Sequence, residues 1–180
     1  MRSQVAIAIA TFLLTLGTAQ AQPTGAVHAG GVVKKPNGGV AAGSAGAIRG
    51  PQGGAAAHAG GVSTDGQGNV QTARTSAFKG PQGAMGGRAG ATTRGADGSV
   101  QHSSGMAAQG AGGGRVRSSG SFSADGSGNA TGTRSTQATS AAGASYSGNT
   151  TVNKQPGQAT VSHTGTCTNA AGQQVACPRR

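Results

Sequence analysis

The feature that most constrains this chain is its shortage of large apolar side chains. From Gln22 to the end, the 180-residue chain has only eleven Val, one Ile, two Met, two Phe and one Tyr, whereas Gly accounts for 36 residues overall. So small a share of Leu, Ile, Val and Phe is typical of chains without a core. Burying this little apolar surface cannot offset a backbone entropy loss of about 1–2 kcal/mol per residue. A conventional globular core is therefore excluded.

The first twenty-one residues differ from the rest and predict an export signal. Arg2 precedes the apolar run Val5–Leu16, and the pattern Ala-Gln-Ala ending at Ala21 supplies the small residues that signal peptidase reads. The run is too short to span the ~30 Å hydrocarbon layer of a membrane. We therefore expect cleavage between Ala21 and Gln22, and a mature chain that is periplasmic or secreted.

Short segments of the mature chain recur at multiples of thirty residues. The recurring segments are His-Ala-Gly-Gly-Val at His28 and His58, Gly-Pro-Gln-Gly at Gly50 and Gly80, and Asp-Gly-x-Gly-Asn at Asp65 and Asp125. Agreement of independent segments on one period predicts a degenerate repeat protein.

Turn signals divide this period further, because Asn-Gly, Asp-Gly, Pro-Gln or Ala-Gly pairs occur about every fifteen residues. Asn-Gly and Asp-Gly accept the positive φ of hairpin turns, and Pro presets φ at a turn corner. Segments between the C-terminal turns, such as Asn129–Thr139 and Ala144–Lys154, are rich in Thr, Ser and Val, which favour strands. In Ala144–Lys154 alternation places Tyr146, Thr150 and Val152 on one face.

We therefore expect a fold that is mostly β or disordered. Low-complexity repeats of about thirty residues form hairpins in the C-terminal half, as an up-and-down meander or a thin β-solenoid. The expected segments are a signal peptide (1–21), a disordered Gly/Ala-rich segment (22–57), and a degenerate Gly/Ser/Thr-rich repeat region (58–180) ending in a disulfide-closed hairpin. A fully disordered low-complexity chain stays the alternative. Helix is disfavoured, because each Gly costs about 1 kcal/mol in a helix.

Two cysteines lie near the end of the chain, Cys167 and Cys177. In an exported protein such an even pair predicts a disulfide, here one that closes the last hairpin. Two registers are open: the cysteines lie directly opposite each other, or a tighter turn puts Cys167 opposite Gln174.

No pattern of residues predicts catalysis or metal binding. Glu is absent, and each of the three Asp precedes a Gly, which marks a turn former. Each Asp-Gly loop offers one carboxylate, whereas calcium needs six or more oxygens. Four histidines are scattered singly: His28, His58, His102 and His163. We expect no catalytic residue, no cofactor, no metal and no enzymatic activity.

The charge is strongly unbalanced, with 14 Lys and Arg against 3 acids and a formal net charge of +11. The cations are spread along the sequence, and aromatic residues that could stack on bases are nearly absent, so sequence-specific nucleic-acid recognition is not expected. Nonspecific, salt-sensitive attraction to envelope polyanions is one consequence. The other consequence of the net charge is that it keeps a Gly-rich chain soluble.

The C-terminal third carries a resemblance, through Asp125-Gly-Ser-Gly-Asn129, Tyr146-Ser-Gly-Asn149 and the closing pair Cys167 and Cys177. It resembles a group of small Gly/Ser/Thr-rich repeat proteins exported by Gram-negative bacteria. The resemblance implies a bacterial periplasmic or extracellular location and brings no activity. The predicted function is that of a non-enzymatic structural or interaction component of the cell envelope or extracellular matrix. The alternative is a cationic binder of polyanions such as lipopolysaccharide, acidic polysaccharide or extracellular DNA.

Overall fold

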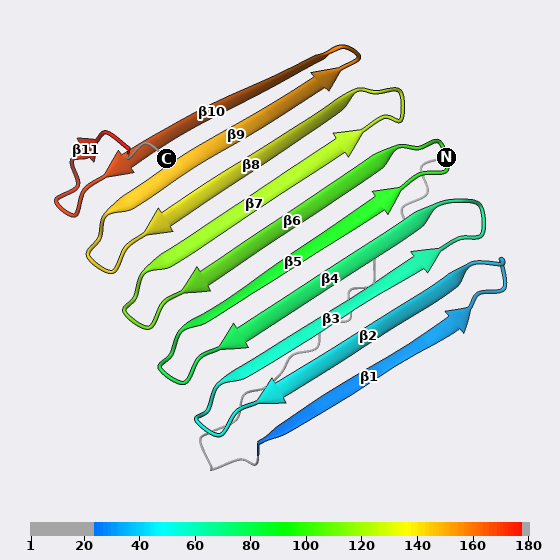
Figure 1. The fold of residues 1–180 in the computed structure, drawn as a ribbon, viewed down its shortest axis with the longest axis horizontal. Helices are drawn as coiled ribbons and strands as arrows, with labels where there is room; N and C mark the ends of the chain where they lie inside the picture. Colours follow the sequence, from blue (N-terminus) through cyan, green and yellow to red (C-terminus); the bar gives the residue numbers. More distant parts are fainter. Residues whose placement is uncertain (1–23, 178–180) are drawn as a thin grey trace.

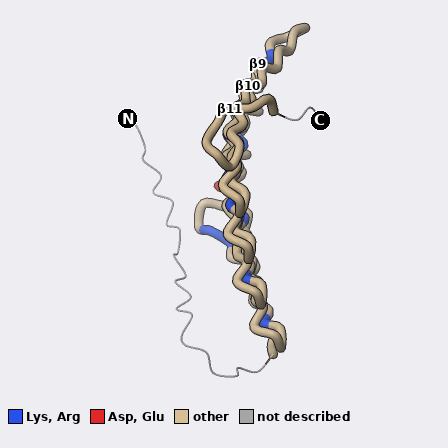
Figure 2. Tube along the Cα trace, turned by 90° about the vertical axis from the view of Figure 1, so that its left-hand side faces the viewer, with Lys and Arg blue, Asp and Glu red and all other residues tan. Residues whose placement is uncertain are grey.

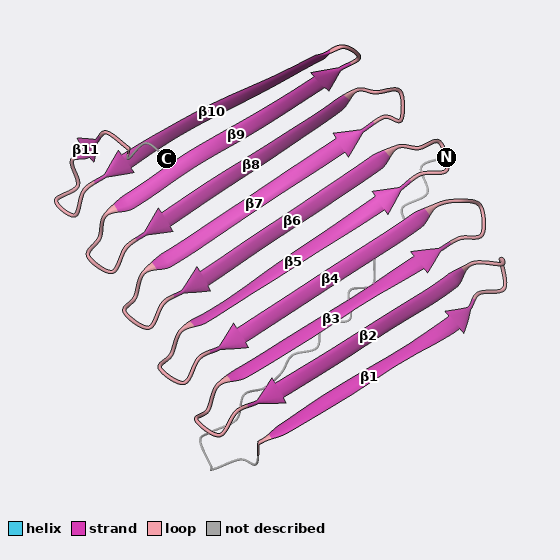
Figure 3. Cartoon of the chain, viewed as in Figure 1, coloured by secondary structure: helices cyan, strands magenta, loops and turns pink. Residues whose placement is uncertain are grey.

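The chain folds into one antiparallel sheet of eleven strands, which follow one another across the sheet in sequence order (Figure 1). The computed structural model describes residues 24–177, which contain strands and turns but no helix (Figure 3). The strands are β1 Gly25–Lys34, β2 Val40–Arg49, β3 Ala55–Thr64, β4 Val70–Lys79, β5 Met85–Arg94, β6 Val100–Gln109, β7 Arg115–Ala124, β8 Ala130–Thr139, β9 Ser145–Gln155, β10 Gln158–Thr168 and β11 Gln174–Val175. The predicted signal peptide and its cleavage site at Ala21 and Gln22 lie outside the described residues.

The sheet is a meander, because each strand pairs with the one before it and the one after it. From β2 to β9, a new strand begins every fifteen residues. The prediction of β hairpins in the C-terminal half is confirmed, and of the two predicted architectures the meander is the one observed.

Turn chemistry explains the regular spacing. Nine of the ten connections are five residues long, and in each the fourth residue is a Gly with φ between 80° and 95°. These glycines are Gly38, Gly53, Gly68, Gly83, Gly98, Gly113, Gly128, Gly143 and Gly172. In the turn after β6, Gly110 N–H donates to the carbonyl of Gly114 and Gly113 N–H donates back to Gly110 at 3.0 Å. Only Gly adopts such a φ without strain, so the Gly at this position determines the turn.

The turn length decides which side chains share a face. A five-residue turn pairs residues of equal parity, as in Lys34 with Val40, so the even-numbered residues of β1–β9 all lie on one face. The two-residue turn Pro156-Gly157 pairs Gln155 with Gln158 and thereby reverses the parity. From β10 onward, odd-numbered residues lie on the face that even-numbered residues occupied before.

The large side chains follow this parity, including its reversal. We call the face formed by even residues of β1–β9 and odd residues of β10 the aromatic face. It carries Phe78, Phe122, Tyr146, Ile48, Met106, all four histidines, and Val32, Val40, Val62, Val70, Val100, Val116, Val152 and Val161. The opposite, small-residue face consists mainly of Ala and Gly in β1–β5 and of Ser, Thr and Asn in β7–β10, with Val27, Val33 and Met85 as its only large apolar residues.

The sheet is a single layer, as its edge-on view shows (Figure 2). Among the described residues, Cys167 is the only buried hydrophobic one and Ser118 the only buried polar one, at 9% and 6% exposed. Phe78 remains 50% exposed and Val161 69% exposed. The expectation that the chain lacks a conventional core is confirmed, and both faces are open to a partner.

The prediction of disorder for residues 22–57 is wrong from Gly25 onward. Residues of this Ala/Gly-rich segment form β1, β2 and the first residues of β3. Ala and Gly have low strand propensity, but propensity largely reflects packing and is overridden by context. Here the context is a full ladder of backbone pairs on both sides of β2, held in register by Gly38 and Gly53 in the flanking turns.

The predicted disulfide is present, since Cys167 and Cys177 are bonded with their Cα atoms 5.2 Å apart. Its register differs from both predicted ones, because Cys167 lies opposite Val175. The reason is the five-residue turn Asn169–Gln173, which is one residue longer than the tighter turn considered from the sequence. The bridge therefore fastens the segment that follows the short edge strand β11 to β10.

Candidate functional site

Side chains of the aromatic face form rows that run across the strands, because the ladders are in register. The middle row comprises Gly30, Ser44, Gly60, Arg74, Gly90, Ser104, Gly120, Arg134, Thr150 and His163. From β1 to β7, every second strand contributes a Gly to this row. At each of these glycines the row is therefore lower than the rows on either side of it.

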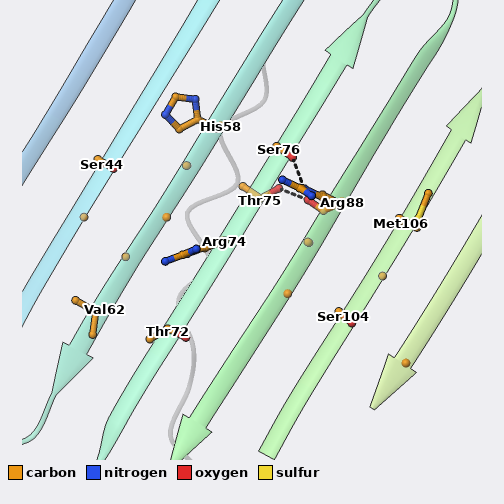
Figure 4. Close-up of a pocket in the computed structure, with 18 of the residues that line it drawn as sticks. Ser44, His58, Val62, Thr72, Arg74, Thr75, Ser76, Arg88, Ser104 and Met106 are labelled. Carbon is orange, nitrogen blue, oxygen red and sulfur yellow. Dashed lines mark hydrogen bonds between the residues drawn. The ribbon is translucent and has the colours of Figure 1, made fainter. Parts of the chain in front are cut away.

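A shallow groove with a volume of about 1040 Å³ follows the middle row, and its lining residues come from β1 to β8. Figure 4 shows its part around Arg74 and Arg88. We call it the transverse groove. Its floor is formed by Ser44, Gly60, Gly90, Ser104 and Gly120. The row on one side includes His58 and Met106, and the row on the other side includes Val32 and Val62. Small hydroxyl groups and backbone thus lie between a mainly polar row, in which Met106 is the apolar residue, and a more apolar row with Val32 and Val62.

Three arginines lie in this groove: Arg74, Arg88 and Arg134. The stem of Arg74 occupies the space above Gly60, where an added Cβ would lie 3.2 Å from Arg74 Cγ. Arg88 Nε donates to Ser76 Oγ on the neighbouring strand at 3.2 Å (Figure 4). An Arg has five N–H donors, so one bond through Nε leaves the forked end for an anion.

Arg134 is held by the most buried side chain on this face. Its Nε donates to Ser118 Oγ at 3.2 Å, and that hydroxyl donates in turn to the carbonyl of Ser135 at 2.9 Å. A second hydroxyl, that of Thr136, lies 3.1 Å from Ser118 Oγ. The guanidinium is therefore oriented by a fixed neighbour and is less free than an ordinary surface Arg.

Rings on the aromatic face lie over glycines of adjacent strands. A Cβ added to Gly86 would be 2.7 Å from Phe78 Cε1, and one added to Gly46 would be 2.7 Å from His58 Cε1. The ring of Tyr146 lies close to Gly165 on the neighbouring strand and to Gly148 on its own strand. A ring placed over a glycine covers the backbone that the missing side chain leaves exposed, a known device in β proteins.

The histidines are less isolated than the sequence indicated. His28 and His58 face each other across β2 with ring centroids 6.4 Å apart. His102 Nδ1 lies 2.8 Å from Thr92 Oγ1, and His163 Nδ1 lies 2.9 Å from Thr150 Oγ1. Within residues 24–177, no group of three His, Cys, Asp or Glu side chains could hold a metal ion.

The three carboxylates occupy turns along one margin of the sheet, which we call the Asp margin. Asp65 Oδ1 accepts hydrogen bonds from the backbone N–H groups of Gln67 and Asn69, and Asp125 repeats this arrangement with Ser127 and Asn129. The side-chain amides of Asn69 and Asn129 contribute most to lowering the pKa of Asp65 and Asp125, and the hydroxyl of Ser99 does so for the pKa of Asp97. The structure places all three in the turns where the sequence put them.

Cations are distributed differently. No carboxylate lies on a described strand, whereas the aromatic face carries Lys34, Arg74, Arg88, Arg94, Arg134 and Lys154. On the small-residue face the strand cations are Arg49, Lys79, Arg115 and Arg117, all at the margin opposite the Asp margin. Figure 2 shows Lys and Arg along the whole extent of the sheet.

From the sequence, the cations were expected to be spread out, and no groove was predicted. The register brings Arg74 and Arg88 onto neighbouring strands and puts Arg74 and Arg134 in one row, four strands apart. The signal that could have found them is their spacing of sixty residues, which equals four strand-and-turn units. Parity would then have placed both on the same face.

No protein-family model, no curated protein and no solved structure matches this chain. Among residues 24–177, no helix is long and apolar enough to cross a membrane.

Proposed function

We propose that this chain is a non-enzymatic structural component of the envelope or extracellular matrix of a Gram-negative bacterium, and that it works as an assembly of stacked sheets. The observation that supports this most is the single-layer sheet with both faces open. Wide sheets usually gain their stability by covering at least one face. With ten long strands of ten or eleven residues, one face has a footprint of about 1,600 Å², roughly twice what each partner contributes to a stable interface.

The small-residue face is the better surface for stacking on a second copy. Its Ala, Gly and Ser side chains are short and present a level surface, and its strand cations are confined to one margin. The aromatic face has cations in its middle, including Arg74, Arg88 and Arg134. Stacking two aromatic faces would bring these like charges together without any described carboxylate between them, which is unfavourable.

Charge also favours one arrangement of the two copies. A two-fold axis that lies between the sheets and perpendicular to the strands puts each margin of one copy over the opposite margin of the other. The cations Arg49, Lys79, Arg115 and Arg117 then approach the carboxylates of Asp65, Asp97 and Asp125 in the partner copy. Lys35 is the one described cation in the turns of the Asp margin. The same axis places Ala/Gly strands on Ala/Gly strands and hydroxyl-rich strands on hydroxyl-rich strands.

Neighbouring alanines on opposite faces of β3 provide a matched test. Ala57 is on the small-residue face and Ala56 on the aromatic face. We expect Ala57→Lys to shift the mature chain from dimers or larger assemblies toward the monomer in light scattering after size-exclusion chromatography. Ala56→Lys should leave the mass unchanged. Equal masses for both variants, or a monomeric parent chain, would contradict assembly through the small-residue face.

Export is part of the proposal and has a test of its own. N-terminal sequencing of protein recovered from the periplasm or the medium should begin at Gln22. Recovery of chains that still begin at Met1 in a membrane pellet would contradict removal of residues 1–21.

A second candidate function is the binding of envelope polyanions. The observation that favours it is the segregation of charge, since the aromatic face carries six strand cations and every carboxylate lies in a turn. Retention of the mature chain on heparin at low salt, with release at moderate salt, is the expected behaviour of such a binder. Retention that is independent of salt would count against it.

A further inference from the structure

The cations of the aromatic face repeat at regular distances across the sheet. Arg74 and Arg134 share the middle row and are four strands apart, which corresponds to about 19 Å at the usual strand spacing. A second row, nearer the Asp margin, carries Lys34, Arg94 and Lys154, again at intervals of four strands. Regularly repeated cations suit an extended ligand with repeated anionic groups, and a compact headgroup would engage only one of them.

The transverse groove has a floor that suits sugar rings. Gly90 and Gly120 leave the backbone accessible between Arg74 and Arg134, and Ser44 and Ser104 add hydroxyl groups at the same level. Hydroxyls of Ser76 and Thr72 border the groove on either side (Figure 4). Alternating hydroxyl groups and backbone match the dense hydroxyl pattern of a carbohydrate, while the apolar side chains of Val62 and Met106 can cover its C–H surfaces.

Other polyanions fit this surface less well. Single-stranded nucleic acid is bound by stacking its bases on aromatic rings, and no Phe, Tyr or Trp lines the transverse groove. A lipid would need a deep apolar recess for its acyl chains, whereas the groove is shallow and its floor is Gly and Ser. Charge complementarity therefore selects an acidic carbohydrate.

We propose that the transverse groove binds a linear acidic polysaccharide, which lies across strands β2–β8 with its carboxylates on Arg74, Arg88 and Arg134. The proposal rests on polyanion binding, the second candidate function above, and names its site and its class of ligand. Each guanidinium fork donates its N–H groups to one carboxylate in a charge-assisted pair, and the Ser76 and Ser118 hydroxyls hold two of the forks in place. The small-residue face takes no part, so the same chain can stack and bind at once.

The test uses two triple variants with the same change in net charge. In the groove variant Arg74, Arg88 and Arg134 become Gln; in the control variant Lys34, Arg94 and Lys154, which lie on the same face but outside the groove, become Gln. The probe is a short, soluble polygalacturonate fragment titrated into the mature chain in a calorimeter, which reports affinity per chain without avidity. We expect the groove variant to bind about tenfold more weakly or worse, and the control to change by less than about threefold. Circular dichroism checks that both variants keep the parent's strand signal.

Four other outcomes are informative. Equal weakening of both variants would overturn the groove and leave diffuse polyanion binding in place. Absence of binding by the parent chain would remove polyanion binding itself. Tighter binding of a DNA oligonucleotide than of polygalacturonate would overturn the ligand class, and equally tight binding of a neutral glucan would overturn the role of the arginines.

Discussion

The role of the positive-φ glycine at the fourth position of each five-residue turn can be tested within one turn. In the connection Gly110–Gly114, Gly113 has a φ of 89° and an added Cβ would meet nothing within 4 Å. Its neighbour Gly112 is not among the positive-φ glycines, and a Cβ there would meet only Ala141 Cβ at 3.8 Å, an ordinary contact. Substitution by Ala therefore introduces backbone strain at Gly113, whereas at Gly112 it introduces neither backbone strain nor a steric clash.

The expected magnitudes follow from this difference. Placing an L-residue in the left-handed region costs about 1–2 kcal/mol, so Gly113→Ala should reduce the free energy of unfolding by about that amount. Gly112→Ala should be neutral or stabilising by up to about 1 kcal/mol, because its only effect is to lower the conformational entropy of the unfolded chain. For a chain of this length, the first change lowers the unfolding midpoint by about 2–8 °C.

Thermal unfolding followed by far-ultraviolet circular dichroism, at one protein concentration for all variants, measures both effects. The mass of each variant in solution should equal that of the parent, because neither substitution lies on a face of the sheet. Equal midpoints for Gly113→Ala and Gly112→Ala, or a higher midpoint for Gly113→Ala, would refute the turn geometry.

Two further predictions concern the margins of the sheet. The pKa of Asp65, Asp97 and Asp125 is lowered by hydrogen bonds to the charged carboxylate, so the stability that these groups provide is complete above their ordinary pKa near 3.8 and is lost as the pH falls through the lowered values. The temperature midpoint of unfolding should therefore decline below about pH 4. Converting Asp65 and Asp125 to Asn should make that decline shallower. A pH profile that is the same in this variant as in the parent would contradict the role of the carboxylates. Replacing Cys167 and Cys177 together by Ser should cost about 2–3 kcal/mol locally, seen as loss of hydrogen-exchange protection confined to β11 and the end of β10; protection lost across all strands would contradict a local role.

Much of the local structure could be predicted from the sequence because it depends on local chemistry. The turn signals Asn37-Gly38, Asp97-Gly98 and Pro156-Gly157 each coincide with an observed turn. Alternation in residues 144–154 correctly placed Tyr146 and Val152 on one face. These inferences needed only the preference of Gly for positive φ and the two-residue period of a strand.

That residues 25–49 form the ordered strands β1 and β2 could not be predicted in this way. Their Ala and Gly residues give no local strand signal, and their pairing is fixed by neighbours that become adjacent only in the folded sheet. The transverse groove was missed for a related reason, since Arg74 and Arg134 are sixty residues apart and meet in one row only through four successive ladders. Local strand propensity cannot predict arrangements that depend on the register of the whole sheet.

In the proposed assembly, this single-layer sheet gains its stability by stacking on a second copy. If so, folding and association are coupled, and the midpoint of unfolding depends on protein concentration. The decisive measurement is the unfolding midpoint of the mature chain over a hundredfold range of concentration, with the mass determined by sedimentation at each end. We expect a midpoint that rises with protein concentration and an assembled species at the highest concentration. A folded monomer whose midpoint stays constant over the whole range would contradict the proposed assembly.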